Sequence, residues 1–457
     1  SNNKYRDKGK MRKYFGTDGV RGRANIEPLT ADFALKLGRA AAGLFKNNDT
    51  HRKIIIGKDT RLSCYMFENA LVSGICSAGI DAVMVGVIPT PAIAFLTKSI
   101  RADAGVVISA SHNPYYDNGI KFFNANGYKL ADITEQEIER MIDNNEPALD
   151  PESIGKAYRI EGIGRYVEFV KSTFPKNIDL KGLKIVVDCA NGASYKAAPL
   201  ALRELGAELI LINVEPNGTN INDNCGAVYP ENMAKAVIEH GADVGISFDG
   251  DADRVVFADE KGNIVDGDKI MGICAVDMME KGTLHNNTIV ATVMSNIGFE
   301  YSMNKKGIKL IRSQVGDRYV MEDMVKNNCN LGGEQSGHLI FSDFNTTGDG
   351  LISAMQVLGL LVKSGKSLSE LCSFIETYPQ VLNNVLVDKK VPLSELSKTS
   401  ALIAKVEKEL GSSGRLLVRY SGTENKLRVM LEGKNEKLIA DFAKEIADTA
   451  VNEIKGK

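Results

Sequence analysis

The stretch GAELILI at residues 206–212 has two counterparts in the chain, GIDAVMV at 79–85 and GIKLIRS at 307–313. In each of them a glycine ends a stretch of helical periodicity and a short apolar run follows, which is the pattern of a helix, a turn and a buried strand. Similar apolar runs, such as 184–187 and 288–292, alternate with helical stretches elsewhere. The pattern predicts an α/β protein whose parallel strands are connected by helices.

Each of these three units continues, roughly 20 to 40 residues later, into an apolar segment, a polar loop and a second apolar segment. The three loops are SASHNPYYDNG (109–119), SFDGDADR (247–254) and GGEQSGH (332–338). They match in pattern and not in identity, so chance similarity among α/β units is an alternative. Because α/β sheets bind ligands at the carboxyl ends of their strands, three repeated domains predict three loops that meet in one cleft.

The last 75 or so residues have a different pattern. Strands are expected at 416–420 and 427–432 on either side of the loop SGTEN, with helices at 400–410 and at about 438–454. The expected fold class is therefore α/β, with three similar α/β domains with mixed sheets plus a smaller C-terminal α+β domain, arranged around a central cleft. The expected domains, in chain order, are 11–160, 161–264, 265–378 and 379–457, after a tag or disordered extension at 1–10.

Composition and charge restrict the class of protein. Of the 457 residues, 44% are hydrophobic and 25% are charged, which excludes a collagenous or largely disordered chain. The net charge of -2 gives no reason to expect nucleic acid or an acidic membrane as partner. The 7 cysteines are odd in number and lack CxxC spacing, which predicts free thiols. Without an apolar run of about 18 residues or an apolar signal segment, a cytoplasmic protein is expected.

The loop SFDGDADR predicts a metal site. Asp249, Asp251 and Asp253 stand at alternate positions, a spacing that can turn three carboxylates toward one divalent cation. A calcium loop is one alternative, and Glu260 stands at its twelfth position, but Arg254 stands where the sharp turn requires glycine. The flanking segments are also typical of strands and not of helices. We therefore predict a Mg²⁺ site with open positions for a phosphate, against the alternative of a solvated acidic turn.

The loop SASHNPYYDNG carries a candidate serine. Pro114 restricts Asn113 to extended conformations, and the small residues allow a tight turn that would present Ser111 and His112 to solvent. Neighbours in sequence seldom form a nucleophile and base pair, and no G-x-S-x-G elbow is present, so a serine hydrolase is excluded. Lys121, inside the apolar segment IKFF, could hold a phosphate or move a proton. The competing interpretation is a serine that only bonds its own turn.

The two remaining loops suit a sugar and a phosphate. GGEQSGH holds a carboxylate, an amide, a hydroxyl and an imidazole beside glycines that let a ligand approach the backbone. RYSGTENKLR places Arg419 and Arg428 on either side of small residues whose N–H groups can hold an anion. The alternatives are an ordinary polar turn for the first loop and, for the second, arginines paired with Glu424 and Glu432.

With FGTDGVRG at 15–22 and GKDTRLS at 57–63, these four loops resemble, in the same order, the motifs of the α-D-phosphohexomutase family. The resemblance runs from about Met11 to the end of the chain, and several motifs in one order are far more specific than any one alone. SASHNP, GEQSGH and the start MRKYFGTDG are similar to the bacterial members that act on glucosamine phosphates. The family's phosphate loop usually reads SGTEP, and Asn425 in place of the proline predicts a less rigid loop.

The resemblance implies a role for each candidate residue. Ser111 would be the phosphoserine and would bind Mg²⁺ together with the three aspartates of the metal loop. Glu334 and Ser336 would hold sugar hydroxyls. The residues implied to grip the phosphate that is not reacting are Arg419, Ser421, Gly422, Thr423 and Arg428. The residues implied to line the centre, as charge stabilisers or acid–base candidates, are Arg21, His112, Lys121, Arg254 and His338.

The implied activity is that of an isomerase that reversibly converts glucosamine 6-phosphate into glucosamine 1-phosphate, in amino-sugar and cell-wall precursor synthesis. Glucosamine 1,6-bisphosphate would be intermediate and activator, formed when the phosphoserine gives its phosphate to the substrate. The implied partner is a phosphosugar, without nucleic acid or membrane, and the protein would be a monomer or homodimer. Two alternatives stay open: a glucose or mannose phosphomutase, and a non-catalytic phosphosugar sensor, against which the presence of Ser111 weighs.

Overall fold

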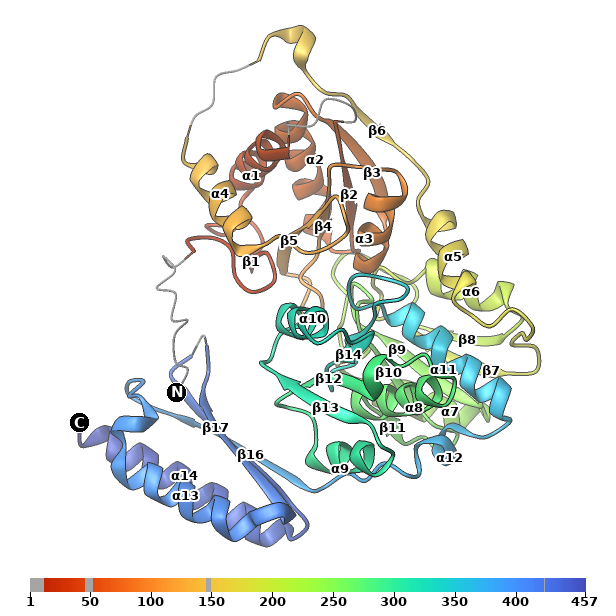
Figure 1. Ribbon diagram of the computed structural model, residues 1–457. Coiled ribbons are helices and arrows are strands. Elements are labelled where there is room, and N and C mark those ends of the chain that lie inside the picture. The colour runs from red at the N-terminus through yellow and green to blue at the C-terminus, as the bar shows by residue number, and fades with distance from the viewer. Residues whose placement is uncertain (1–11, 46–51, 145–148, 423) are drawn as a thin grey trace. The chain divides into compact units, whose positions relative to one another are not determined.

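The computed structural model describes residues 12–45, 52–144, 149–422 and 424–457. The expected tag or extension at 1–10 lies outside these ranges. The chain forms two compact units, which we describe separately: residues up to 294 with 308–373, and residues 295–307 with 374–457 (Figure 1). Among the described residues no helix is long and apolar enough to cross a membrane.

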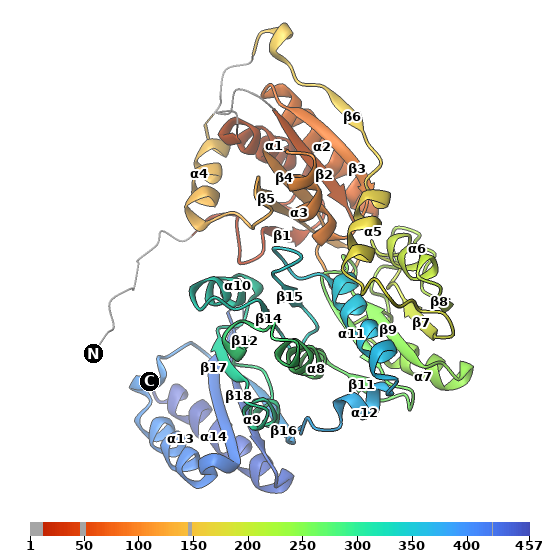
Figure 2. The same ribbon diagram turned by 45° about the vertical axis from the view of Figure 1, so that its right-hand side comes forward.

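The first unit contains three mixed sheets built on one plan (Figures 1 and 2). In each sheet a central strand has two parallel neighbours, and one neighbour is followed by an antiparallel strand that returns through a short loop. The shared order is β3-β2-β4-β5 in the first sheet, β8-β7-β9-β10 in the second and β13-β12-β14-β15 in the third. The three repeated α/β units and the position of their polar loops are thus confirmed.

The first sheet has two extra edge strands and is covered on both faces. Its strands are β1 (Val20–Arg23), β2 (Lys53–Lys58), β3 (Asp81–Val87), β4 (Ala104–Ile108), β5 (Asp117–Asn124) and β6 (Ala157–Arg159). Its helices are α1 (Ala31–Phe45), α2 (Leu62–Ser77), α3 (Thr90–Ser99) and α4 (Asp132–Ile142). Ile54 and Ile56 face α1 and α2, whereas Cβ atoms at Gly57 and Gly105 would meet Ile93 of α3 at 2.6 and 2.8 Å. Burial on both faces explains why β2 reads as a continuous apolar run.

The second and third sheets are shorter versions of the first. The second comprises β7 (Lys184–Asp188), β8 (Glu208–Ile212), β9 (Val244–Phe248), β10 (Val255–Ala258) and β11 (Ile264–Val265), with α5 (Ile163–Ser172), α6 (Ala197–Glu204) and α7 (Glu231–His240). The third comprises β12 (Thr288–Thr292), β13 (Lys309–Ser313), β14 (Leu331–Gly333) and β15 (Leu339–Phe341), with α8 (Gly267–Glu280), α10 (Asp317–Lys326), α11 (Gly350–Ser364) and α12 (Leu368–Cys372). The seven cysteines are free, and all but Cys76 are buried.

The second unit contains an antiparallel sheet of order β16-β18-β17 with helices packed against it. Its elements are β16 (Gln380–Leu386), α13 (Ser397–Leu410), β17 (Gly414–Tyr420), β18 (Lys426–Gly433) and α14 (Glu436–Lys455). The two expected strands and both helices are confirmed, but the sequence analysis missed β16. This edge strand alternates exposed and partly buried residues, so four of its seven residues are open to solvent.

Helix α9 (Ile297–Lys305) belongs to the second unit although it leads into β13 of the third sheet. Ile297 N donates to Oε2 of the buried Glu432 at 3.1 Å. A Cβ atom at Gly298 would come within 2.4 Å of the Glu376 carbonyl oxygen, so the helix lies directly against this segment. Residues 295–307 of the expected domain 265–378 are therefore part of the second unit, and the four domain boundaries stay a prediction.

Candidate active site

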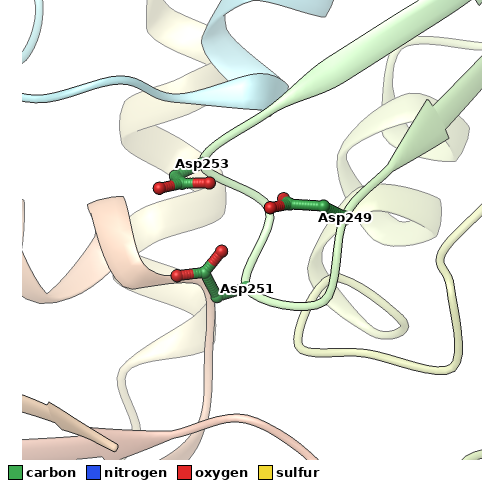
Figure 3. Close-up of side chains that lie close together, drawn as sticks. All are labelled: Asp249, Asp251 and Asp253. Atoms are coloured by element: carbon green, nitrogen blue, oxygen red, sulfur yellow. The ribbon is translucent and has the colours of Figure 1, made fainter. Parts of the chain in front are cut away.

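The loop between β9 and β10 gathers three buried carboxylates (Figure 3). Asp249, Asp251 and Asp253 each offer an oxygen within 4.8 Å of the others. Burial and the two neighbouring carboxylates raise the pKa of Asp249 well above its usual value. Oδ1 of Asp251 and Oδ1 of Asp253 are buried without a hydrogen-bond partner among the described residues. Three carboxylates that repel one another, with two oxygens lacking a hydrogen-bond partner, form a ligand set that fits a hard divalent cation.

The calcium-loop alternative is excluded by the surroundings of this loop. The flanking segments are strands β9 and β10, paired with each other, and not helices. Glu260, which stands at the twelfth position, accepts hydrogen bonds from the backbone N and the Oγ of Ser369 at 3.0 and 2.7 Å. Its carboxylate is therefore engaged elsewhere.

Ser111 lies in the loop between β4 and β5, in a left-handed conformation with φ of 53°. Its Oγ donates to Oδ2 of Asp249 at 2.8 Å, so the serine and the aspartate cluster form one site. The expectation that Ser111 is presented to solvent is wrong, because the residue is only 2% exposed. The aspartate loop of the second sheet covers it: a Cβ atom at Gly250 would come within 2.4 Å of the Ser111 carbonyl oxygen.

His112 is partly buried beside Ser111 and contacts Arg254. Nη1 of Arg254 lies 3.0 Å from Nδ1 of His112. A guanidinium can only donate, so Nδ1 accepts and the imidazole proton is on Nε2. Burial and the charges of Arg254 and Arg21 lower the pKa of His112 to about 4, which keeps the ring neutral at physiological pH.

Lys121 on β5 is buried between two carboxylates. Its Nζ lies 3.0 Å from Oδ2 of Asp251 and 3.3 Å from Oδ2 of Asp18. Asp18 also pairs with Arg21 at 2.6 Å and with Lys129 at 2.7 Å. Burial alone would raise the pKa of Asp18, but the three cations hold it well below its usual value. The sequence analysis missed Asp18, although it stands in the quoted motif FGTDGVRG.

The loop between β14 and β15 lies beside the same cluster. Oε1 of Glu334 accepts a hydrogen bond from Gly316 N at 3.1 Å. The ring of the buried His338 lies between Oδ2 of Asp253 at 3.5 Å and Oδ2 of Asp317 at 3.6 Å. Ser336 is exposed. Asp317 was also missed, although it opens α10 after strand β13, in a place where an α/β sheet commonly binds its ligand.

A cavity of about 380 Å³ joins these groups. Of the residues expected from the sequence, those that line it are Arg21, Ser111, Asp253, Arg254, Glu334 and His338. His112 contacts its wall at Arg254, and Lys121 contacts it at Asp18. Side chains from all three sheets of the first unit thus surround one space, as the repeated loops predicted.

The expected phosphate loop lies in the second unit, between β17 and β18. Arg419 and Arg428 are cross-strand partners, and Nε of Arg428 is buried without a hydrogen-bond partner among the described residues. The alternative pairing is excluded, because Glu424 binds Lys426 and Glu432 binds Arg415. In the ranges that the structure describes, neither guanidinium has a carboxylate partner, and two such adjacent groups suit an anion. Ser421 and Gly422 belong to the same loop, whereas Thr423 lies outside the described residues.

The segment that follows β16 supports this loop. Val387 N donates to the Asn425 carbonyl oxygen at 2.9 Å, and the Tyr420 hydroxyl donates to the Val391 carbonyl oxygen at 2.5 Å. Nζ of Lys390 donates to the Ser421 carbonyl oxygen at 2.6 Å. Lys390 is therefore a third cation at the loop, which sequence analysis missed. These bonds hold the loop at the position where Asn425 replaces proline.

A buried polar network lies directly behind the metal loop. Asp349 caps α11 by accepting from Leu351 N and Ile352 N, both at 2.9 Å. The hydroxyl of Tyr166 lies 2.9 and 2.8 Å from the two oxygens of Asp349. The next residue, Gly350, donates its N–H to the Ala252 carbonyl oxygen between the metal-loop aspartates. The first turn of α11 therefore fixes the backbone of that loop.

Comparison with known protein families agrees with this architecture. The families of phosphoglucomutase/phosphomannomutase α/β/α domains I, II and III match residues 12–148, 164–262 and 266–378, and the family of the C-terminal domain matches 382–449. The chain belongs to the phosphoglucomutase/phosphomannomutase family, whose members are phosphohexomutases.

Two relatives have nearly the same length as this chain. The phosphoglucosamine mutase of Syntrophotalea carbinolica is 57% identical over 442 residues, which are 96% of this chain and 97% of the relative. The phosphoglucosamine mutase of Geobacter metallireducens is 57% identical over 451 residues, which are 98% of this chain and 100% of the relative.

Solved structures share the fold at low sequence identity. A phosphoglucomutase/phosphomannomutase family protein from Burkholderia thailandensis superposes with a TM-score of 0.80 at 23% identity, covering 96% of this chain and 97% of that one. N-acetylphosphoglucosamine mutase from Aspergillus fumigatus, solved with GlcNAc-6P and magnesium, has a TM-score of 0.67 at 17% identity, with 97% and 96% covered.

Proposed function

We propose that the protein is a phosphoglucosamine mutase, which interconverts glucosamine 6-phosphate and glucosamine 1-phosphate through a phosphoserine at Ser111. The single observation that carries the proposal is the 2.8 Å hydrogen bond from Ser111 Oγ to Asp249 within the cluster of three buried carboxylates. Relatives of that activity at 57% identity support glucosamine as the sugar. The reaction would take place in the cytoplasm and supply amino sugars for cell-wall precursors.

We propose that Asp249, Asp251 and Asp253, with a phosphate oxygen on Ser111, hold Mg²⁺. The unpaired, buried Oδ1 atoms of Asp251 and Asp253 support this ligand set. When bound, the ion would offset the negative charge that develops during phosphoryl transfer. A magnesium complex of the Aspergillus fumigatus relative is consistent with this choice of metal.

In the proposed mechanism, phosphoserine 111 transfers its phosphoryl group to the free 1-hydroxyl of glucosamine 6-phosphate. The new bond joins phosphorus to the sugar oxygen, the Ser111 Oγ–phosphorus bond breaks, the sugar hydroxyl proton passes to a nearby base, and Ser111 Oγ takes up a proton. The product, glucosamine 1,6-bisphosphate, turns over in the site and returns its 6-phosphoryl group to Ser111: a bond forms between Oγ and phosphorus, the bond from phosphorus to the sugar 6-oxygen breaks, Ser111 gives up its hydroxyl proton, and the 6-oxygen takes up a proton. The 1-phosphate then leaves, and the enzyme is again phosphorylated.

The surrounding side chains have roles that fit this chemistry. Arg21, Lys121 and Arg254 would stabilise the charge on the transferring group, and His112 and His338 are the candidates for moving the proton. Glu334 and Ser336 would bind sugar hydroxyls. The residues that would hold the phosphate that is not reacting are Arg419, Ser421, Gly422, Thr423 and Arg428. The protein would work as a monomer or homodimer.

The test is a mutase assay with a matched variant. Purified protein is incubated with Mg²⁺, a trace of glucosamine 1,6-bisphosphate and glucosamine 1-phosphate, and formation of the 6-phosphate is followed. Turnover by the wild type that Ser111→Ala abolishes is the expected result. Turnover of glucose 1-phosphate or mannose 1-phosphate but not of glucosamine 1-phosphate would keep the mutase reaction and change the proposed substrate. If protein phosphorylated at Ser111 turned over none of the three sugar phosphates, a phosphosugar sensor would be favoured.

A further inference from the structure

Two side chains from different sheets hold the backbone carbonyl of Ser111. Nη2 of Arg61 donates to this oxygen at 3.0 Å, and Nδ2 of Asn222 donates to it at 2.8 Å. Arg61 precedes α2 beside the first sheet, and Asn222 lies in the loop between β8 and α7 of the second sheet. Neither residue is among those that line the cavity.

Arg61 is placed to fix the serine loop and not to bind a ligand. Its side chain is completely buried, and its Nη1 also donates to the carbonyl oxygens of Asn113 and Pro114 at 3.0 and 2.9 Å. Oδ2 of Asp59 lies 3.0 Å from Nε of Arg61. Asp59 therefore balances the charge of the guanidinium, whose two Nη groups bond three backbone carbonyl oxygens of the serine loop.

Asp59 extends this support to the other side of Ser111. The Ser109 hydroxyl donates to Oδ2 of Asp59 at 2.6 Å and accepts from Ser111 N at 2.9 Å. Both the N–H and the C=O of Ser111 are thus bonded to side chains with fixed positions. The motif GKDTRLS, which the proposed function leaves without a role, supplies both Asp59 and Arg61.

Asn222 ties the same loop to the domain that carries the metal ligands. Its Nδ2 also donates to the Asn113 carbonyl oxygen at 3.1 Å, and its own backbone is left-handed with φ of 58°. A Cβ atom at Gly250 would meet the Ser111 carbonyl oxygen at 2.4 Å and Nδ2 of Asn222 at 2.7 Å. The carbonyl is consequently enclosed by Arg61, Asn222 and the metal loop.

We infer that Arg61 and Asn222 are positioning residues that hold Ser111 in its left-handed conformation and so aim its Oγ at the metal cluster. The inference rests on the proposed phosphoserine role of Ser111. A serine with φ of 53° persists only where its surroundings impose it, because the side chain crowds the backbone there. Without one donor the carbonyl rotates, and the Oγ that follows it leaves Asp249. Misplacement of a reacting group by about 1 Å can lower a rate by roughly a hundredfold.

The experiment compares Asn222→Ala with Asn220→Ala. Asn220 lies in the same loop, but within the described part of the chain its side chain bonds Asn217 N and the Glu215 carbonyl oxygen and not the serine loop. We expect kcat to fall about 10- to 100-fold in Asn222→Ala with KM for the sugar phosphate within about twofold, and both constants to stay within about twofold in Asn220→Ala. Arg61→Lys keeps the positive charge but loses the guanidinium group that bonds several carbonyls at once. In this variant, too, kcat should fall while KM changes little.

Hydrogen exchange in metal-free protein gives a second readout that needs no turnover. In Asn222→Ala the amides of residues 111–113 should exchange faster than in wild type, while the strands of the second sheet stay unchanged. Equal kcat in wild type and Asn222→Ala, or a rise in exchange across the whole domain, would overturn the inference and leave the mutase proposal intact. Absence of mutase turnover in the wild type would instead overturn the proposed function.

Discussion

Replacing Tyr166 by phenylalanine should destabilise the protein more at neutral pH than at mildly acidic pH. The tyrosine hydroxyl bonds the carboxyl group of Asp349, which caps α11 behind the metal loop. Burial raises the pKa of Asp349 from 3.8 to about 6. The native state thus keeps a proton that the unfolded chain releases, so this residue favours folding below pH 4 and that contribution is lost as the pH rises to 6. The loss amounts to about 3 kcal/mol.

The size of the Tyr166→Phe effect follows from the charge of its partner. Above pH 7 Asp349 is ionised, and loss of a hydrogen bond to a charged group costs about 1.5–3 kcal/mol. At pH 5 most of Asp349 is protonated, and loss of a bond between neutral groups costs about 1 kcal/mol. The difference between wild type and variant should therefore be about 1 kcal/mol larger at pH 7.5 than at pH 5.

The assay is urea unfolding of wild type and Tyr166→Phe at both pH values, with the free energies extrapolated to water. Tyr229→Phe, which changes an exposed tyrosine, serves as control and should shift the unfolding free energy by less than about 0.5 kcal/mol at either pH. In the Asp349→Asn background the effect of Tyr166→Phe should no longer depend on pH. Equal losses at the two pH values in the wild-type background would refute the argument.

Three further predictions concern the metal cluster and the second unit. Mg²⁺ at a hundred times its dissociation constant should stabilise the wild type against unfolding by about 2.7 kcal/mol and Asp249→Asn far less. Calorimetric unfolding with Mg²⁺ or with EDTA checks this, and an equal shift of the unfolding temperature in both proteins would contradict it. Lys390→Met should raise KM for the sugar phosphate about 3- to 10-fold with kcat little changed, because the hydrogen-bond donor beside Ser421 is lost. The control is Lys389→Met at the exposed neighbouring residue, which should change neither constant. Arg415→Met should cost about 3–5 kcal/mol in urea unfolding because it leaves the buried Glu432 without its cation, and Glu432→Gln in the same chain should recover part of the loss.

The sequence predicted those features that lie within one short segment. Apolar runs such as 184–187 mark strands, and the polar loops that follow them meet in one place because parallel strands end at the same edge of a sheet. The alternate aspartates were found because their spacing alone brings their oxygens together. Strand β16 was missed because an edge strand with one exposed face lacks a continuous apolar run.

The missed features depend on partners far away in the chain. Asp18 belongs to the site because it pairs with Lys121 and Lys129, and Asn222 because it bonds a loop more than a hundred residues earlier in the chain. The burial of Ser111 has the same origin, because the covering glycine stands at position 250 in another sheet. Local pattern carries no information about such pairs.

The place of α9 limits how this protein can be divided. The chain passes between the two units after residues 294, 307 and 373, so the second unit is assembled from two separate stretches of sequence. A fragment that begins near residue 379 would lack α9, and the backbone N–H that Ile297 gives to Glu432 would be missing from it. The C-terminal region is therefore not a detachable module. An autonomous version would need α9 joined to it by a new linker, and the remainder would need a new crossover from the carboxyl end of β12 to the amino end of the parallel strand β13.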